Sequence, residues 1–188
     1  MSIAILRGLL VSSIAMKKIL AVAAVMLMVL VGGQGEALAA ADFEKPFEDN
    51  MAVAAHVEDP NGEYCQENWV MEPPPFLWTM VAKGCFTRNG DVWAIQDSFG
   101  DTYQTFIYWE NWLWTGSSWQ PYRSGWCNNN LGAPNWGKCN KDYYESSSKN
   151  FYGGKGSKIR FQICRRQPWA TTCNPGSIND APWINNNA

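Results

Sequence analysis

The tryptophans are the residues of this sequence whose type and spacing most clearly suggest a binding function. The chain has 11 of them among 188 residues, and three fall in one short segment, at Trp109, Trp112 and Trp114. Side chains of a strand alternate between its two faces, so Trp109 should point to one face and the other two to the opposite face. A domain of this size has a core too small to enclose every ring. We therefore expect the surplus rings to form an exposed aromatic surface.

Such a surface has a defined chemistry. An indole ring offers an apolar plane for one face of a sugar, and side-chain amides offer partners for the sugar hydroxyls. Tryptophan and tyrosine also dominate the binding energy of protein interfaces. The aromatic residues here adjoin an asparagine-rich stretch that supplies the amides. The predicted ligand-binding residues are Trp112, Trp114, Trp119, Tyr122, Trp126, Asn128, Asn130, Asn135 and Trp136.

Nucleophilic catalysis finds little support in this chain. His56 is the single histidine, and it lies next to Glu58 and Asp59. In this setting a solvated surface histidine is expected, rather than the general base of a nucleophile–histidine–acid triad. If all cysteines are paired, no thiol nucleophile remains. We predict a protein that is not an enzyme and that has no cofactor.

Carboxylates are the other candidates for chemistry, because a pair of them can hydrolyse glycosides without a histidine. The four that cluster in the sequence are Asp91, Asp97, Asp101 and Glu110. Asp97 and Asp101 flank a turn, where aspartate commonly accepts backbone hydrogen bonds, and we interpret them in that way. Calcium coordination by these two residues is the alternative, although the spacing of a regular calcium loop is absent.

Six cysteines follow the apolar N-terminal segment, an even number that is typical of a disulfide framework in an exported protein. Their short separations favour pairing between neighbours, with a nested pairing such as Cys85–Cys164 as an open alternative. Zinc sites require closely spaced thiolates or histidines, which this sequence lacks, so no metal site is predicted. The predicted pairs are Cys65–Cys85, Cys127–Cys139 and Cys164–Cys173.

The N-terminal segment, residues 1–39, has the pattern of a secretory signal peptide. A basic start at Lys17 precedes an apolar run over residues 19–31 and a small-residue cleavage site. This run is shorter than the roughly 20 residues that span a bilayer. Residues 1–15 are interpreted as an over-called start, with Met16 as the true one. We expect contact with the membrane only during export and an extracellular location, with a retained anchor as the alternative.

The charge of the chain excludes one class of partner. There are 15 basic and 17 acidic residues, which give a net charge of −2, and no tract of clustered lysine and arginine. Binding of a phosphate backbone requires several converging cations. We therefore predict no nucleic-acid partner.

The remainder of the chain divides into a leader and connection at residues 40–78 and a β-rich domain at residues 79–188. Segments rich in β-branched and aromatic residues alternate there with turn signals, and none shows helical periodicity. The clearest strand is SKIRFQICRR at residues 157–166, in which apolar and polar residues alternate. This pattern predicts an all-β fold, a compact antiparallel β-sandwich or small barrel stapled by three disulfides.

The order of short motifs between about residues 84 and 165 resembles a known family. These motifs are GCF, NGD followed by VWAIQD, a Trp-rich strand, RSGWCN, CNKD and a closing FQIC. They are similar to small secreted actinobacterial proteins whose function is uncharacterised. The resemblance implies a compact disulfide-bonded β-sandwich and supplies no catalytic residues.

These observations together predict a secreted, non-catalytic binding module. The expected partner is a glycan or cell-wall polysaccharide that contacts exposed tryptophans. One alternative is a secreted protein that binds another extracellular protein, as a protease inhibitor or a toxin does. The other alternative is a structural exoprotein without a ligand.

Overall fold

The computed structural model describes residues 42–55, 64–72 and 76–186. The predicted signal peptide, His56 and the prolines at residues 73–75 lie outside these ranges. The described residues form strands together with a single 3-10 turn, η1 (Ile178–Asp180), and they include no α-helix. The predicted all-β class is confirmed.

The strands form two sheets, here named sheet A and sheet B. The strands of sheet A are β1 (Glu48–Met51), β6 (Gln104–Trp114), β7 (Trp119–Asn129), β9 (Ser157–Arg166), β10 (Thr171–Asn174) and β11 (Ile184–Asn186). Their order is β1-β7-β6-β9-β10, and β11 also pairs with β9. The strands of sheet B are β2 (Val53–Ala54), β3 (Tyr64–Met71), β4 (Trp78–Thr87), β5 (Val92–Asp97) and β8 (Trp136–Asn140). Their order is β2-β8-β5-β4-β3.

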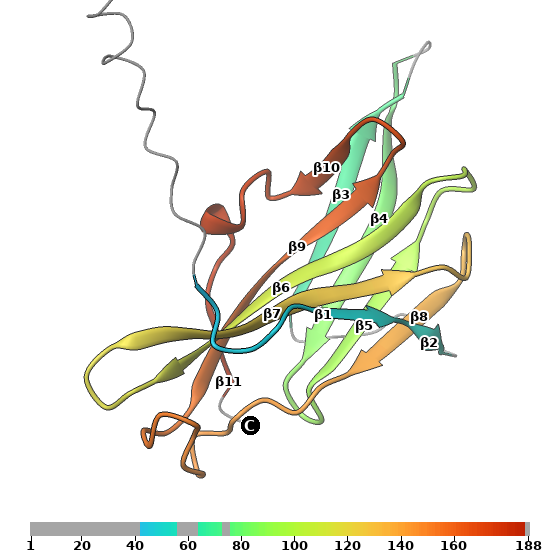
Figure 1. Ribbon diagram of the computed structural model, residues 1–188. Coiled ribbons are helices and arrows are strands. Elements are labelled where there is room, and N and C mark those ends of the chain that lie inside the picture. The colour runs from blue at the N-terminus through green and yellow to red at the C-terminus, as the bar shows by residue number, and fades with distance from the viewer. Residues whose placement is uncertain (1–41, 56–63, 73–75, 187–188) are drawn as a thin grey trace, which may run out of the picture. The chain divides into compact units, whose positions relative to one another are not determined.

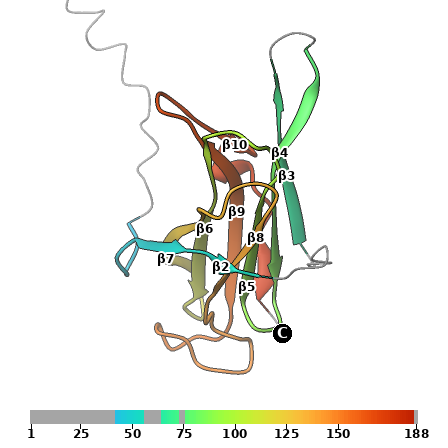
Figure 2. The ribbon, with the colours of Figure 1, turned by 90° about the vertical axis from the view of Figure 1, so that its right-hand side faces the viewer.

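The two sheets pack face to face as a β-sandwich and do not close into a barrel (Figures 1 and 2). The core between them is rich in aromatic rings. Trp93 and Phe86 from sheet B meet Trp109 and Phe161 from sheet A, and all four are fully or almost fully buried. Neighbouring pairs are antiparallel except for β1 and β7, which are parallel. Alternation of inward and outward side chains along each strand therefore determines which residues reach the outer surface.

The segment around β1 and β2 corrects the prediction of a leader at residues 40–78. β1 pairs with β7 in sheet A, and β2 pairs with β8 in sheet B, so this segment crosses from one sheet to the other (Figure 2). Glu48 of β1 also forms a 2.6 Å ion pair with the ammonium of Lys141, the residue after β8. These strands are short, and their pairing partners are more than 70 residues away. Local sequence pattern therefore gave little indication of them.

β3 corrects the same prediction, because it is a full strand at the edge of sheet B. It pairs with β4 over its whole length, with a bulge between Asn68 and Trp69. Asn68 is buried, and its Nδ2 donates a 3.1 Å hydrogen bond to the carbonyl oxygen of Ile163 in sheet A. This contact ties the edge of one sheet to the other.

All three predicted disulfides are present. Cys65–Cys85 joins β3 to β4, and Cys164–Cys173 joins β9 to β10, so each links neighbouring strands of one sheet. Cys127–Cys139 joins β7 to β8 and therefore links sheet A to sheet B through the core. The described residues include no free cysteine.

Candidate functional site

The structure separates the tryptophans of β6 in the way that strand alternation predicts. Trp109 is fully buried in the core, whereas Trp112 and Trp114 are half-buried on the outer face of sheet A. The register shift near Trp112 is confined to the pairing with β7, and the pairing with β9 continues without interruption. Trp93 and Trp109 are the fully enclosed indoles, and every other tryptophan keeps some exposed surface.

Four of the exposed or half-buried tryptophans lie together at one end of sheet A, and three of them, Trp112, Trp119 and Trp183, contact one lysine. This tryptophan–lysine cluster consists of Trp112, Trp114, Trp119, Trp183 and Lys158. The rings of Trp112 and Trp183 form one edge-to-face pair, with centroids 5.3 Å apart, and Trp114 and Trp119 form a second, tilted pair at the same distance. The Lys158 ammonium lies 3.9 Å from the centroid of Trp183 and 4.8 Å from that of Trp119. It therefore links the two pairs by cation–π attraction.

The register of four strands, β6, β7, β9 and β11, positions this cluster. Trp114 lies opposite Trp119 in the β6–β7 hairpin, and Trp112 lies opposite Lys158 across β6 and β9. Side chains directly opposite each other share a face of the sheet. Trp183 precedes β11, which pairs with β9 so that Asn185 lies opposite Lys158. Strand pairing thus brings residues that are about 70 positions apart to one surface.

The next row of the same face is occupied by a buried ion pair. Arg160 contacts Glu110 at 2.7 Å, and the Tyr108 hydroxyl donates a 3.0 Å hydrogen bond to the other carboxylate oxygen. The guanidinium of Arg160 also lies 4.5 Å from the ring centroid of Trp183. Arg160 and Tyr108 therefore hold the Glu110 carboxylate in place, and Arg160 in turn packs against Trp183 of the cluster.

Burial and charge act on the lysine of the cluster. Burial against the indoles lowers the pKa of Lys158 below its usual range, and the positive charge of Arg160 lowers it further. Both effects disfavour the ammonium form. A negative charge placed beside Lys158 would offset both of them.

An open cleft of about 350 Å³ adjoins the cluster. The indoles of Trp114 and Trp119 form its apolar part, and its other lining residues are Ser146, Lys155, Gly156 and Asn185. The loop between β8 and β9 supplies Ser146 and Lys155. Asn150 holds this loop in place, because its Nδ2 donates hydrogen bonds to the carbonyl oxygens of Trp114, at 2.8 Å, and Gly156, at 3.0 Å. The cleft thus combines flat apolar rings with hydroxyl, amide and ammonium groups.

The asparagines of the predicted site are largely engaged in holding the protein's own chain. Asn128 is buried and donates a 2.6 Å hydrogen bond to Asp49 in β1. Asn135 donates to the carbonyl oxygen of Leu131 within the loop between β7 and β8. Asn130 is exposed and accepts a hydrogen bond from Gln104. These amides order the strand ends and the loop.

The remaining aromatic residues of the predicted site lie apart from the cluster. Trp126 packs on Phe106 at the middle of sheet A, and Trp136 is half-buried on β8 of sheet B. Tyr122 is buried beside Phe151, with ring centroids 5.5 Å apart.

Of the nine predicted ligand-binding residues, the structure brings three together: Trp112, Trp114 and Trp119. These three lie at the end of sheet A where β7 begins, whereas the asparagine-rich loop follows the end of β7. A strand of this length spans roughly 30 Å. The structure therefore does not join the indoles and the loop asparagines in one surface, and Asn185 and Ser146 are the polar groups beside the rings.

The four carboxylates considered for hydrolysis or calcium have other partners. Asp97 accepts a 3.2 Å hydrogen bond from the backbone of Phe99, and Asp101 accepts one of 2.6 Å from the backbone of Tyr103. Both therefore act in the turn, as their positions predicted. Burial raises the pKa of Asp97, and Asp101 also pairs with Arg165. Within the described ranges, no group of three or more potential ligands could hold a metal ion.

Sequence reasoning missed Lys158, Trp183, Lys155, Ser146 and Asn185 as parts of the site. One signal was available for the lysine. The alternation of residues 157–166 places Lys158 on the face opposite Ile159, the face that strand pairing gives to Trp112. Trp183 is 25 positions further along the chain, and only the pairing of β11 with β9 reveals its place.

Comparison with known proteins adds no assignment. No family model, curated protein or solved structure matches this chain. The resemblance to small secreted actinobacterial proteins therefore stays a prediction. Among the described residues there is also no helix long and apolar enough to cross a membrane.

Proposed function

We propose that this protein is a secreted, non-catalytic glycan-binding module whose ligand lies against the tryptophan–lysine cluster and the adjoining cleft. The observation that carries the proposal is the placement of Trp114 and Trp119 in the wall of an open cleft, beside Ser146 and Asn185. Apolar ring faces with a few convergent polar groups are the usual composition of a small-molecule site. Three disulfides are consistent with an exported protein.

The rings in this site have defined orientations before any ligand arrives. Trp119 contacts Trp114 on one side and the Lys158 ammonium on another, and the pairing of β6 with β7 fixes its backbone. A ring that is already ordered loses little conformational entropy on binding. A disulfide between the sheets, Cys127–Cys139, further limits their relative movement.

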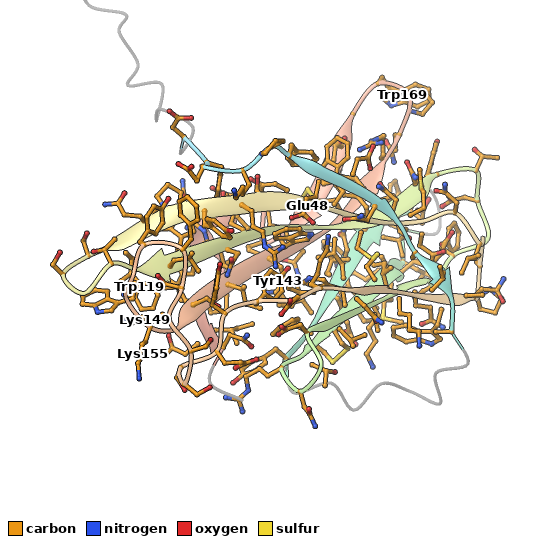
Figure 3. All side chains as sticks on the ribbon, turned by 60° about the horizontal axis from the view of Figure 1, so that its bottom comes forward. Glu48, Trp119, Tyr143, Lys149, Lys155 and Trp169 are labelled. Carbon is orange, nitrogen blue, oxygen red and sulfur yellow. A yellow bond between two sulfur atoms is a disulfide. The ribbon has the colours of Figure 1, made fainter. Side chains whose placement is uncertain are left out.

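Binding to polysaccharides tests the proposal. Purified oxidised protein is incubated with insoluble cellulose, chitin, peptidoglycan and cross-linked pectin, and the retained fraction is measured. We expect retention on at least one of them and its loss in Trp119→Ala. Trp169→Ala is the matched control, because Trp169 is 77% exposed at the tip of the β9–β10 hairpin, at the opposite end of the sandwich (Figure 3). Absence of retention on every polysaccharide would reject the proposal.

A second candidate function, binding of another extracellular protein, is favoured by a different surface. The β3–β4 hairpin has an uncharged cross-strand pair, Met71 opposite Trp78, and the adjacent Trp69 and Leu77 are also exposed. Large exposed apolar residues that lie together commonly mark an interface. Inhibition assays against a panel of extracellular proteases, with Trp78→Ala as the test variant, test whether the protein is a protease inhibitor. If it inhibits none of them, the hypothesis of a protease inhibitor is rejected.

A further inference from the structure

Three lysines gather at the end of the sandwich that carries the cleft. Lys149 and Lys155 lie directly opposite each other in an isolated antiparallel bridge of the loop between β8 and β9. Both are exposed, and in Figure 3 they appear at the end of the sandwich that carries Trp119. Lys155 lines the cleft, and Lys158 lies over the ring of Trp119. The Trp119 indole is therefore shared by the cleft and by the third lysine.

This arrangement is unfavourable for the protein alone. Like charges directly opposite each other in a sheet are destabilising. Burial and the neighbouring Arg160 also disfavour the charged form of Lys158. A bound anion would relieve both effects.

Several buried or partly buried cations elsewhere in the protein have carboxylate partners. Arg160 pairs with Glu110, Arg165 pairs with Glu72 at 3.3 Å, and Lys141 pairs with Glu48. In the described part of the chain, by contrast, Lys149, Lys155 and Lys158 form no ion pair. Lys155 and Lys158 thus lie beside the aromatic rings of the cleft without a carboxylate of the described chain to balance their charge.

We infer that the glycan bound at this cleft is acidic, a polysaccharide whose sugar units carry carboxylate groups, as uronic acids do. The inference rests on the proposed function and specifies its ligand class. The sugar ring stacks on the indoles of Trp114 and Trp119, and the ammonium groups of Lys155 and Lys158 attract its carboxylate. Charge-assisted hydrogen bonds from ammonium to carboxylate are about twice as strong as neutral ones. The lysine charges would therefore select acidic over neutral sugars, and the indole rings would provide the stacking surface for both.

A matched pair of ligands isolates the contribution of charge. Polygalacturonate oligomers and the same oligomers with every carboxylate methyl-esterified differ in charge and not in backbone. Calorimetric titration at low and moderate salt measures both affinities. We expect the acidic oligomer to bind about tenfold more tightly at low salt, a difference of about 1.4 kcal/mol. This preference should decrease as salt screens the charges.

Substitutions assign the preference to this site. Lys155→Gln should weaken binding of the acidic oligomer by about five- to tenfold and leave binding of the ester unchanged. Lys138→Gln is the control, because Lys138 is exposed on β8 of sheet B and should affect neither ligand. Trp119→Ala should abolish binding of both oligomers, because it removes the stacking surface.

The possible outcomes separate this inference from the function on which it rests. Equal binding of acid and ester, with no effect of Lys155→Gln, would overturn the acidic class and leave glycan binding intact. Failure to bind any polysaccharide, neutral or acidic, would remove both. Equally tight binding of single-stranded DNA and of dextran sulfate, unaffected by Trp119→Ala, would show a general polyanion patch and overturn the inference.

Discussion

The indole Nε1 of Trp93 donates a 2.9 Å hydrogen bond to the hydroxyl oxygen of Tyr143. Trp93 belongs to β5, whereas Tyr143 lies in the loop that leads from sheet B back to sheet A. Both side chains are almost completely buried, at 0% and 2% exposure. The indole N–H therefore has no access to water, and its acceptor is supplied by a loop rather than by a strand.

Removal of this acceptor should destabilise the fold. Tyr143→Phe keeps the ring but leaves the buried Trp93 N–H unpaired, which typically costs about 1–3 kcal/mol. Chemical denaturation monitored by tryptophan fluorescence measures the change. Tyr103→Phe, at a half-exposed tyrosine, is the control and should change the free energy of unfolding by less than about 0.5 kcal/mol. Equal effects of the two substitutions would contradict the assigned role of the hydrogen bond.

A buried carboxylate should make stability depend on pH. Asp91 accepts hydrogen bonds from the backbone of Tyr143 and from Asn186, and burial raises its pKa above the usual 3.8. Because the folded state favours the protonated form, this contribution to stability is complete below the unfolded pKa. It is lost as pH rises through the folded pKa.

Asp91→Asn removes this titration, so the wild type should lose stability relative to the variant as pH rises from about 3 to about 6. Denaturation curves of both proteins across this range measure the difference. Asp180→Asn, at an exposed position in η1, provides the comparison for the loss of one carboxylate. A constant difference between wild type and Asp91→Asn would refute the assignment.

The loop that lines the cleft depends on a close backbone approach at Gly154. A Cβ atom at this position would collide with the backbone oxygen of Trp114. Gly154→Ala should therefore displace the loop, lower the free energy of unfolding by about 1–3 kcal/mol and weaken ligand binding. Gly100→Ala, where a Cβ meets nothing within 4 Å, should leave both quantities unchanged. Thermal denaturation and the polysaccharide assay give the two readings.

The disulfide between the sheets should contribute more to stability than the one at the β9–β10 edge. Cys127 and Cys139 are both buried in the core, whereas Cys173 is half-exposed. Replacing Cys127 and Cys139 by alanine should lower the free energy of unfolding by about 2–5 kcal/mol, since it removes a crosslink and leaves a cavity. The corresponding change at Cys164 and Cys173 should cost less. Denaturant titrations of the two double variants measure the loss of unfolding free energy in each. A larger loss for the Cys164 and Cys173 variant would show that burial of the sulfurs does not determine the contribution of a disulfide.

The parts of this fold that could be predicted are those that local pattern determines. Alternation in residues 157–166 and turn residues at Asn89 and Gly90 located β9 and the β4–β5 turn, because neighbouring side chains determine these features. Cysteine spacing gave the three disulfides. Parity along β6 predicted that Trp109 lies on one face and Trp112 and Trp114 on the other, and the structure shows that Trp109 is the one in the core.

The parts that could not be predicted depend on distant pairing. β1 has a short and partly acidic sequence, and it becomes a strand because β7 presents an open edge to it. Tyr143 lies in a polar segment, and its burial depends on Trp93, 50 positions away. The position of Lys158 among indoles depends on Trp183, which only the register of β11 brings near. Each of these contacts joins residues that are far apart in the chain, so the pattern of a short sequence segment cannot predict it.

The two faces of β6 have different roles, since Trp109 packs in the core and Trp112 and Trp114 face the proposed ligand. A deletion of one residue between Trp109 and Trp112 would exchange these roles, because each later side chain would turn to the other side. Homologues that share the proposed binding surface should therefore tolerate changes of residue type along β6 far better than changes in its length. Gaps in a future alignment should fall outside this strand.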